Sequence, residues 1–211
     1  PNGSGKSTLA KILAGHPLYE VSSGEILFEN NSLLNVSPEL RSHFGIFLGF
    51  QSPLEISGIT TYDFLRVLYN QKQKYINQKE LDPIEFFSLL KTFMEKLNIS
   101  KELLYRNFNE GFSGGEKKRL EILQMFLLKP KLIILDEIDS GLDLDAIKII
   151  YESILKYKEE NSSILLISHN PIILEYIQPS FVHILKNGQI FRTGSNDLIF
   201  KIFKDGYNSI T

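Results

Sequence analysis

Three short segments carry residues whose types and spacing could do chemistry on a phosphate ester. The first opens the chain, which begins Pro1-Asn2-Gly3-Ser4-Gly5-Lys6-Ser7-Thr8. In a loop of this kind the backbone amides of residues 2–6 cradle phosphate oxygens, Lys6 reaches the outer phosphates, and the Ser7 hydroxyl binds Mg²⁺. The segment therefore predicts a phosphate-binding loop. A loop that is merely rich in glycine is the alternative.

The second segment is Ser113-Gly114-Gly115-Glu116, at the start of a helix that we expect to run to about Leu128. The simplest interpretation is a capping box, in which Ser113 caps the first amides and Glu116 bonds back to the Ser113 amide. A capping box does not explain two glycines in the first turn, where each weakens a helix. Because glycine permits close approach and an open helix N-terminus favours an anion, we predict a phosphate contact here.

The third segment is Asp136-Glu137, which follows the continuous apolar run Leu132 to Leu135. Such a run is typical of a buried parallel strand, and open α/β sheets bind ligands at the carboxyl ends of their strands. A buried acidic pair is unfavourable without a cation nearby. An acidic pair on the surface without a function is therefore a poor explanation for these two residues. We predict that Asp136 holds Mg²⁺, directly or through water, and that Glu137 is the general base for an attacking water or polarises it.

Composition bounds the possible functions. The 211 residues are 43% hydrophobic, enough for the core of one globular unit. The net charge is −2 without a basic stripe, so we expect no nucleic-acid partner. There are no cysteines, which excludes disulfides and thiolate-held clusters. No apolar run approaches the roughly 18 residues of a membrane span, which argues against direct insertion but not against docking on a membrane protein.

The elements that must position these segments follow from apolar patterns and caps. A first helix should begin at Thr8 and end at Gly15, and Ser37-Pro38 should open a short second helix. A helical block should run from Thr60 to about Leu104, with a polar loop or helix end at Gln71–Glu80. Further predicted elements are strands at 25–28, 45–50 and 164–167, a hairpin with a turn at Asn187-Gly188, and a terminal helix at 197–204.

In order and spacing these motifs resemble the ATP-binding cassette (ABC) ATPases. The likeness rests on the opening loop, Ser113-Gly114-Gly115, Asp136-Glu137 and Asp139-Ser140-Gly141-Leu142-Asp143. It implies an α/β fold of the P-loop NTPase type, with a mostly parallel sheet and a helical subdomain at about 52–128. The phosphate loop lacks its usual first glycine and preceding strand, so we expect residues 1–211 to be a single ABC domain without its N-terminal strands.

The resemblance also assigns roles that the residues alone leave open. A lone glutamine after a strand is usually a turn residue, but in this family Gln51 would touch Mg²⁺ and its water. A lone histidine is usually structural, but His169 matches the family's γ-phosphate contact. The implied catalytic residues are Lys6, Glu137 and His169. The implied ATP-binding residues are Asn2, Gly3, Ser4, Gly5, Lys6, Ser7, Thr8, Gln51, Ser113, Gly114 and Gly115, and the implied metal ligands are Ser7, Gln51 and Asp136.

One chain cannot complete such a site. The resemblance implies a head-to-tail dimer of two copies, in which Ser113-Gly114-Gly115 of one closes over the γ-phosphate bound by the other. Ser140 to Asp143 would contact the opposite subunit. It further implies that Lys118 pairs with Glu137 in the resting monomer and holds the base away from water.

A narrower resemblance is to the SufC-type ATPase subunits of the SUF iron–sulfur cluster assembly system. It rests on Asn109-Glu110-Gly111-Phe112 before Ser113, on Phe50 to Ile56, and on Asp139 to Ala146. It implies SufB- and SufD-like scaffold subunits as partners, and plastid stroma or bacterial cytoplasm as the location. Leu120 and Asn170 depart from the pattern, and we expect both to affect the surface or partner fit rather than chemistry.

Two alternatives share these motifs. A nucleotide-binding subunit of an ABC membrane transporter would carry every ATP motif, and only the Asn109 to Phe112 prefix and its companions argue against it. A non-catalytic interaction protein could use the same fold as a scaffold, but intact Lys6, Asp136, Glu137 and His169 argue against that.

Overall fold

The centre of the molecule is a three-stranded parallel sheet in the order β3 (Ile46–Gly49), β6 (Leu132–Asp136) and β7 (Ser163–Ile167). The computed structural model describes residues 2–157, 159–168, 170 and 173–205. Leu135 of β6 pairs with Gly49 on one side and with Leu166 on the other. The three strands therefore run in register and end together.

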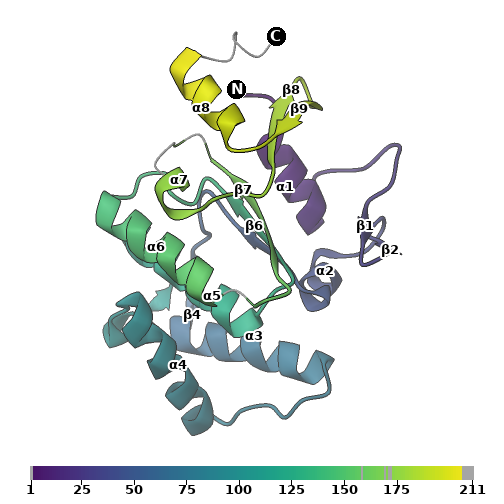
Figure 1. The fold of residues 1–211 in the computed structure, drawn as a ribbon. Coiled ribbons are helices and arrows are strands. Elements are labelled where there is room, and N and C mark those ends of the chain that lie inside the picture. The colour runs from purple at the N-terminus through teal and green to yellow at the C-terminus, as the bar shows by residue number, and fades with distance from the viewer. Residues whose placement is uncertain (1, 158, 169, 171–172, 206–211) are drawn as a thin grey trace.

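Both faces of this sheet are covered, as the unbroken apolar runs predict. Ile134 packs with Ala10 of helix α1 (Lys6–Ala14) on one face. Its neighbours Ile133 and Leu135 point the other way, into the larger core cluster built with α5 (Gly114–Leu128) and α6 (Leu144–Tyr157). Figure 1 shows α1 and α6 on opposite sides of β6 and β7.

The helix of the phosphate loop is anchored at its C-terminal end by one buried arginine. Arg41 lies in α2 (Pro38–Phe44), which Ser37 caps as predicted, and is 6% exposed. Its guanidinium donates to the carbonyls of Ile12 and Leu13, at 2.7 and 3.1 Å, and to two further carbonyls, those of Leu33 and Val36. Gly15 ends α1 at φ 81°, where a side chain would meet Arg41 at 2.9 Å.

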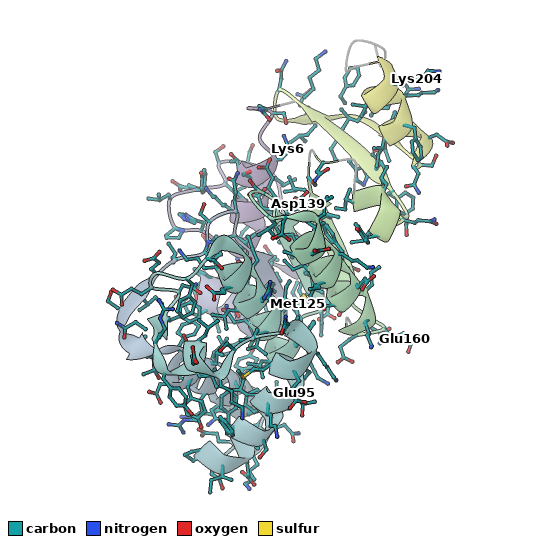
Figure 2. The ribbon with its side chains drawn as sticks, turned by 90° about the vertical axis from the view of Figure 1, so that its left-hand side faces the viewer. Lys6, Glu95, Met125, Asp139, Glu160 and Lys204 are labelled. Carbon is teal, nitrogen blue, oxygen red and sulfur yellow. The ribbon has the colours of Figure 1, made fainter. Side chains whose placement is uncertain are left out.

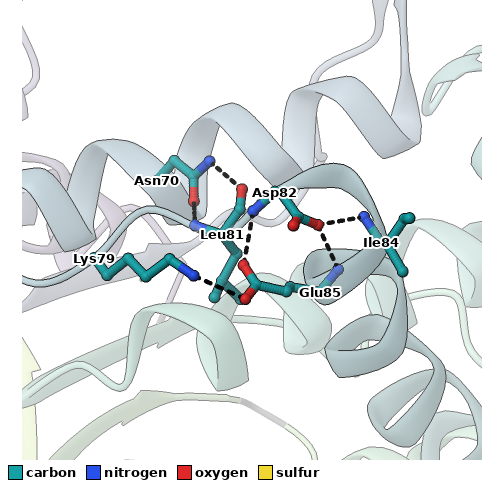
Figure 3. A network of polar contacts seen from close by, with 6 residues as sticks. All are labelled: Asn70, Lys79, Leu81, Asp82, Ile84 and Glu85. Atoms are coloured by element: carbon teal, nitrogen blue, oxygen red, sulfur yellow. Dashed lines mark hydrogen bonds and ion pairs between the residues drawn. The ribbon is translucent and has the colours of Figure 1, made fainter.

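Helices α3 (Thr61–Tyr75) and α4 (Pro83–Leu97) lie on the far side of α5 from α1 (Figure 1). Their connection is fixed by the polar network in Figure 3. The Asn70 amide exchanges two 3.0 Å bonds with the backbone of Leu81, and Asp82 and Glu85 form a capping box at the start of α4. Helix α3 extends to Tyr75, into the segment predicted as a polar loop or helix end, because Asn70 bonds the end of that segment to the helix.

Short elements complete the chain. The strands β1 (Leu27–Phe28) and β2 (Asn31–Ser32), and β4 (Ile56–Thr60) and β5 (Asn107–Phe108), form two antiparallel pairs. A 3₁₀ turn, η1, spans Lys101–Tyr105, and α7 spans Ile173–Tyr176. The predicted hairpin and terminal helix are confirmed as β8 (Val182–Lys186), β9 (Gln189–Gly194) and α8 (Asp197–Asp205). Sequence patterns did not predict β4 and β5, whose pairing joins segments about 50 positions apart.

We predict that Arg41→Met lowers the free energy of unfolding by about 3 kcal/mol, because four backbone carbonyls lose the bonds from the buried guanidinium. Chemical denaturation followed by circular dichroism measures the change. Arg192→Met, on the exposed surface of β9, is the matched control and should change stability by less than about 0.5 kcal/mol. Equal stabilities of the two variants would contradict the anchoring role of Arg41.

Candidate active site

The phosphate loop leads directly into α1, as the sequence predicted. Gly5 is the N-cap residue and Lys6 is the first helical residue, two positions earlier than expected. Ser4 is buried, and its carbonyl accepts a 3.0 Å bond from the Gly188 amide in the hairpin turn. The Lys6 ammonium lies 3.5 Å from the Ser4 hydroxyl. Asn2 and Gly3 are exposed, so the loop before α1 is open to the outside.

Two of the predicted ligands, 129 positions apart in sequence, meet at the end of β6. The Ser7 hydroxyl donates to the Asp136 carboxylate at 3.1 Å. Asp136 is only 4% exposed, which makes it a buried carboxylate at the carboxyl end of the central strand. A hydroxyl and a carboxylate oxygen in contact are the donors that a hard cation such as Mg²⁺ prefers. The donor set therefore fits the group expected there.

Glu137, the predicted base, is hydrogen-bonded to Gln51, the predicted glutamine of the site. Gln51 Nε2 donates to Glu137 Oε2 at 2.8 Å, although the residues are 86 positions apart. The Glu137 amide donates to the Ile167 carbonyl at 2.9 Å, which ties the end of β6 to the end of β7. Glu137 has a φ of 49°, a left-handed conformation that an L side chain adopts at a cost of about 1–2 kcal/mol. Such strain collects at functional sites.

A second buried carboxylate, that of Asp139, bonds to Ser168, the residue that directly follows β7. The Ser168 hydroxyl donates to Asp139 at 3.2 Å and accepts the amide of Asn170 at 3.0 Å. His169 itself lies outside the described residues, so its predicted role stays a prediction. Burial, and to a smaller extent the charge of Asp139, raises the pKa of Tyr151 well above its usual range. Figure 2 shows Lys6 and Asp139 towards the same end of the molecule, away from Met125 and Glu95.

The capping box predicted for the second segment is confirmed. The Ser113 amide donates to Glu116 at 2.7 Å, and the Glu116 amide donates to the Ser113 hydroxyl at 3.3 Å. Ser113 and Gly114 are exposed. A side chain at Gly114 would approach Leu142, in the loop after Glu137, at 3.9 Å. The start of α5 is thus accessible from outside the chain, and its contact with a phosphate stays a prediction.

The expected pairing of Lys118 with Glu137 is wrong for this structure. Lys118 instead pairs with Glu121 at 3.0 Å and donates to the carbonyl of Phe50. Lys118 and Glu121 lie about one helical turn apart on the buried face of α5, and that face packs against the end of β3, so Lys118 reaches Glu121 and the Phe50 carbonyl. The side chain of Glu137 is engaged by Gln51.

The expectation for Leu120 is also wrong. Leu120 is fully buried in the main hydrophobic cluster, so its apolar side chain serves packing rather than the surface. Asn170 is half-buried and takes part in the Ser168 turn. Sequence reasoning overlooked Glu121 and Asp139 as site-supporting residues. A signal for Glu121 was available, because it stands three residues after Lys118 within an otherwise apolar stretch.

No group of three or more histidine, aspartate and glutamate side chains able to hold a metal occurs in the described part of the chain. A cation held by one carboxylate, one hydroxyl and the oxygens of a bound phosphate needs no such group. Over the same described ranges, no helix is both long and apolar enough to cross a membrane.

We predict that Glu137→Gly raises the free energy of unfolding by about 1 kcal/mol, because glycine adopts a positive φ without strain. Thermal unfolding measures the change. The same substitution at Glu95, an exposed residue inside α4, should lower stability by about 1 kcal/mol. Destabilisation of similar size at both positions would show that residue 137 is not strained.

Known proteins resemble this chain in sequence. A family model described as "ABC transporter" matches residues 1–140. The "Probable ATP-dependent transporter ycf16" of Trieres chinensis is 54% identical over 98% of this chain and 82% of its own length. "ABC transporter I family member 6, chloroplastic" of Arabidopsis thaliana is 48% identical over the whole of this chain and 62% of its own length.

Solved structures show the same fold. MJ1267, described as "an ATP-binding cassette of an ABC transporter", matches all of this chain and 85% of its own with a TM-score of 0.73 and 27% identity. A dimeric structure of MJ0796, described as "a Bacterial ABC Transporter Cassette", matches 92% of this chain and 82% of its own with a TM-score of 0.75 and 19% identity, which speaks for the fold alone. The chain therefore belongs to the ATP-binding cassette family, with the mixed α/β fold and parallel sheet core of its ATP-binding ATPase domains.

Proposed function

We propose that this protein hydrolyses ATP to ADP and phosphate with Mg²⁺. One observation carries the proposal: the Ser7–Asp136 and Gln51–Glu137 bonds lie at the carboxyl ends of β3 and β6, beside the phosphate loop. Four residues from three distant parts of the sequence thus supply a cation ligand set and a carboxylate for water at one edge of the sheet. Open α/β sheets bind their ligands at this edge.

Each of the site residues then has a distinct task. The amides of residues 2–6 and the ammonium of Lys6 bind the phosphates and stabilise negative charge on them. Ser7, Asp136 and Gln51 would hold Mg²⁺, which supplies further charge stabilisation when bound. Glu137 accepts a proton from the attacking water or orients it, and its bond from Gln51 fixes the carboxylate. His169 would contact the γ-phosphate.

We propose that two copies act together, each closing the other's site. The surfaces that must meet are open in the single chain, since Ser113, Gly114, Ser140, Gly141 and Asp143 are all exposed. The MJ0796 cassette, which shares this fold, is itself described as dimeric. ATP then joins the copies head to tail, and its hydrolysis loosens them. The helical subdomain at about 52–128 would pass this motion to a partner.

We propose that the partner is the SUF scaffold, made of SufB- and SufD-like subunits, on which cluster assembly takes place. The segment that carries the narrower resemblance contacts the loop after Gln51. Asn109 is buried and donates to the Leu54 carbonyl at 2.8 Å, and Glu110 accepts a bond from Ser57. Asn109 and Glu110 thereby hold the loop that follows Gln51, which is the part of an ABC domain expected to meet its partner.

The proposed location is the plastid stroma, with bacterial cytoplasm as the other setting that fits the family. The relative from Arabidopsis thaliana is named chloroplastic, which supports the plastid.

A transporter subunit remains the second candidate. The names of the family model and of the ycf16 relatives both contain the word transporter, and this favours a membrane permease as the partner. The ATP chemistry proposed above is the same in either case. The two candidates differ only in what binds beside Gln51 and the helical subdomain.

We predict that Glu137→Gln keeps ATP binding but lowers kcat by about 100-fold or more, because the amide retains shape and loses the proton acceptor. Filter binding of labelled ATP and a phosphate-release assay measure the two properties. Glu152→Gln, on the exposed face of α6, is the matched control and should leave both unchanged. Retained turnover in Glu137→Gln would remove Glu137 from its assigned role.

We predict that the full-length protein, used as bait in an extract, recovers SUF scaffold subunits that raise its ATPase rate. The readouts are mass spectrometry of the bound material and phosphate release with and without it. Recovery of a membrane permease instead would assign the chain to transport and overturn the cluster-assembly proposal. ATP hydrolysis by the isolated protein is measured in the same experiment and is independent of that choice.

A further inference from the structure

A buried ion pair lies on the inner face of helix α5. Lys118 and Glu121 are 3.0 Å apart, and their side chains are only 4% and 6% exposed. Desolvation makes such pairs expensive, and well-packed apolar residues of similar volume are often as stable or more stable. Stability alone therefore does not account for two charges at this place in the core.

Both members of the pair bind the backbone of one residue. Glu121 Oε1 accepts the amide of Phe50 at 2.7 Å, and the Lys118 ammonium donates to the carbonyl of Phe50. A carboxylate only accepts and an ammonium only donates, so each charge matches the one backbone group that it contacts. Phe50 is the first residue after β3, and its peptide groups are thus fixed against α5 rather than against another strand.

Residue 49, the last residue of β3, is a glycine that lies beside Glu121. A Cβ at Gly49 would lie 3.2 Å from Leu135 and 3.6 Å from the carboxyl carbon of Glu121. A Cβ there would crowd the Leu135 side chain and touch Glu121 at ordinary contact distance. The end of β3 is therefore packed directly against the carboxyl group of Glu121 just before Phe50.

The residue held in this way directly precedes Gln51, whose amide donates to Glu137 at 2.8 Å. A continuous set of contacts thus runs from Lys118 and Glu121 through the Phe50 backbone to the side chains of Gln51 and Glu137. Its first members lie on the same helix as Ser113-Gly114-Gly115, about one to two turns further along. A shift of α5 would move the Phe50 backbone, and Gln51 with it.

We propose that Lys118 and Glu121 are positioning residues, which set Gln51 and thereby the carboxylate of Glu137 according to the position of helix α5. The proposal rests on the proposed ATPase function. Binding at the exposed start of α5 is then transmitted to the group that handles the water. The ion pair is the link, because both of its members bind the backbone of Phe50 and also bind each other.

The test compares the full-length protein with the double variant Lys118→Met/Glu121→Met. Removing both charges leaves no unpaired buried ion, so this variant should remain folded. Its dissociation constant for ATP should stay within about twofold of the parent, while kcat falls by about tenfold to 100-fold, as expected for misplacement of about 1 Å. The matched control is Lys91→Met/Glu95→Met, an exposed pair on α4, which should leave both values unchanged.

A purely structural role makes a different prediction. The double variant would then turn over at the parental rate whenever it is folded, and this result would overturn the proposal. An equal loss of kcat in the exposed-pair control would overturn it as well. The single variant Lys118→Met adds a check. It should be less stable than the double variant, because it leaves Glu121 buried without its partner, and its kcat should be lowered as much as that of the double variant.

Hydrogen exchange provides a readout that does not depend on activity. In the double variant the amide of Phe50 loses its acceptor, so its exchange should quicken by about tenfold or more while β6 stays protected. Unchanged exchange at Phe50 would overturn the inference even if the enzyme is impaired. If the parent protein hydrolyses no ATP, the proposed function fails instead, and the exchange result still decides whether the ion pair holds the loop.

Discussion

The candidate site depends on the in-register parallel pairing of β3, β6 and β7. Because Gly49, Leu135 and Leu166 lie side by side, the residues that follow each strand emerge at one edge of the sheet. Gln51, Asp136 and Ser168 owe their proximity to this pairing and to nothing local in their own segments. A shift of register by one residue in any strand would separate them and turn the apolar side chains to the wrong face.

Acidic groups are concentrated at this edge, and each has a specific partner. Asp136 accepts from Ser7, Asp139 accepts from Ser168, Glu137 accepts from Gln51, and Glu121 pairs with Lys118. A carboxylate that is buried without a hydrogen-bond or ion-pair partner would take up a proton or destabilise the folded state. The donors therefore orient a set of carboxylates, which chemistry with a cation, water and phosphate requires.

Much of the architecture was predictable because its signals are local. Caps at Ser37, Asp82 and Ser113 and apolar runs at β3, β6 and β7 located most of the long elements to within two residues. The extension of α3 to Tyr75 was not predictable, because Asn70 stabilises it through a bond to Leu81. Strands β4 and β5 were also not predicted, since their pairing brings together segments about 50 positions apart.

The sequence by itself determined the chemistry that is available: a glycine-rich loop ending in lysine and serine, an acidic pair after a buried strand, and a capped helix beginning with two glycines. Residue types and short spacings carry that information. Only the tertiary structure decided which side chains meet. Lys118 was expected to reach Glu137, but burial of α5 against the end of β3 brought it to Glu121 and the Phe50 carbonyl. The reason is that partners of buried charges are chosen by packing and desolvation, and these depend on the whole fold.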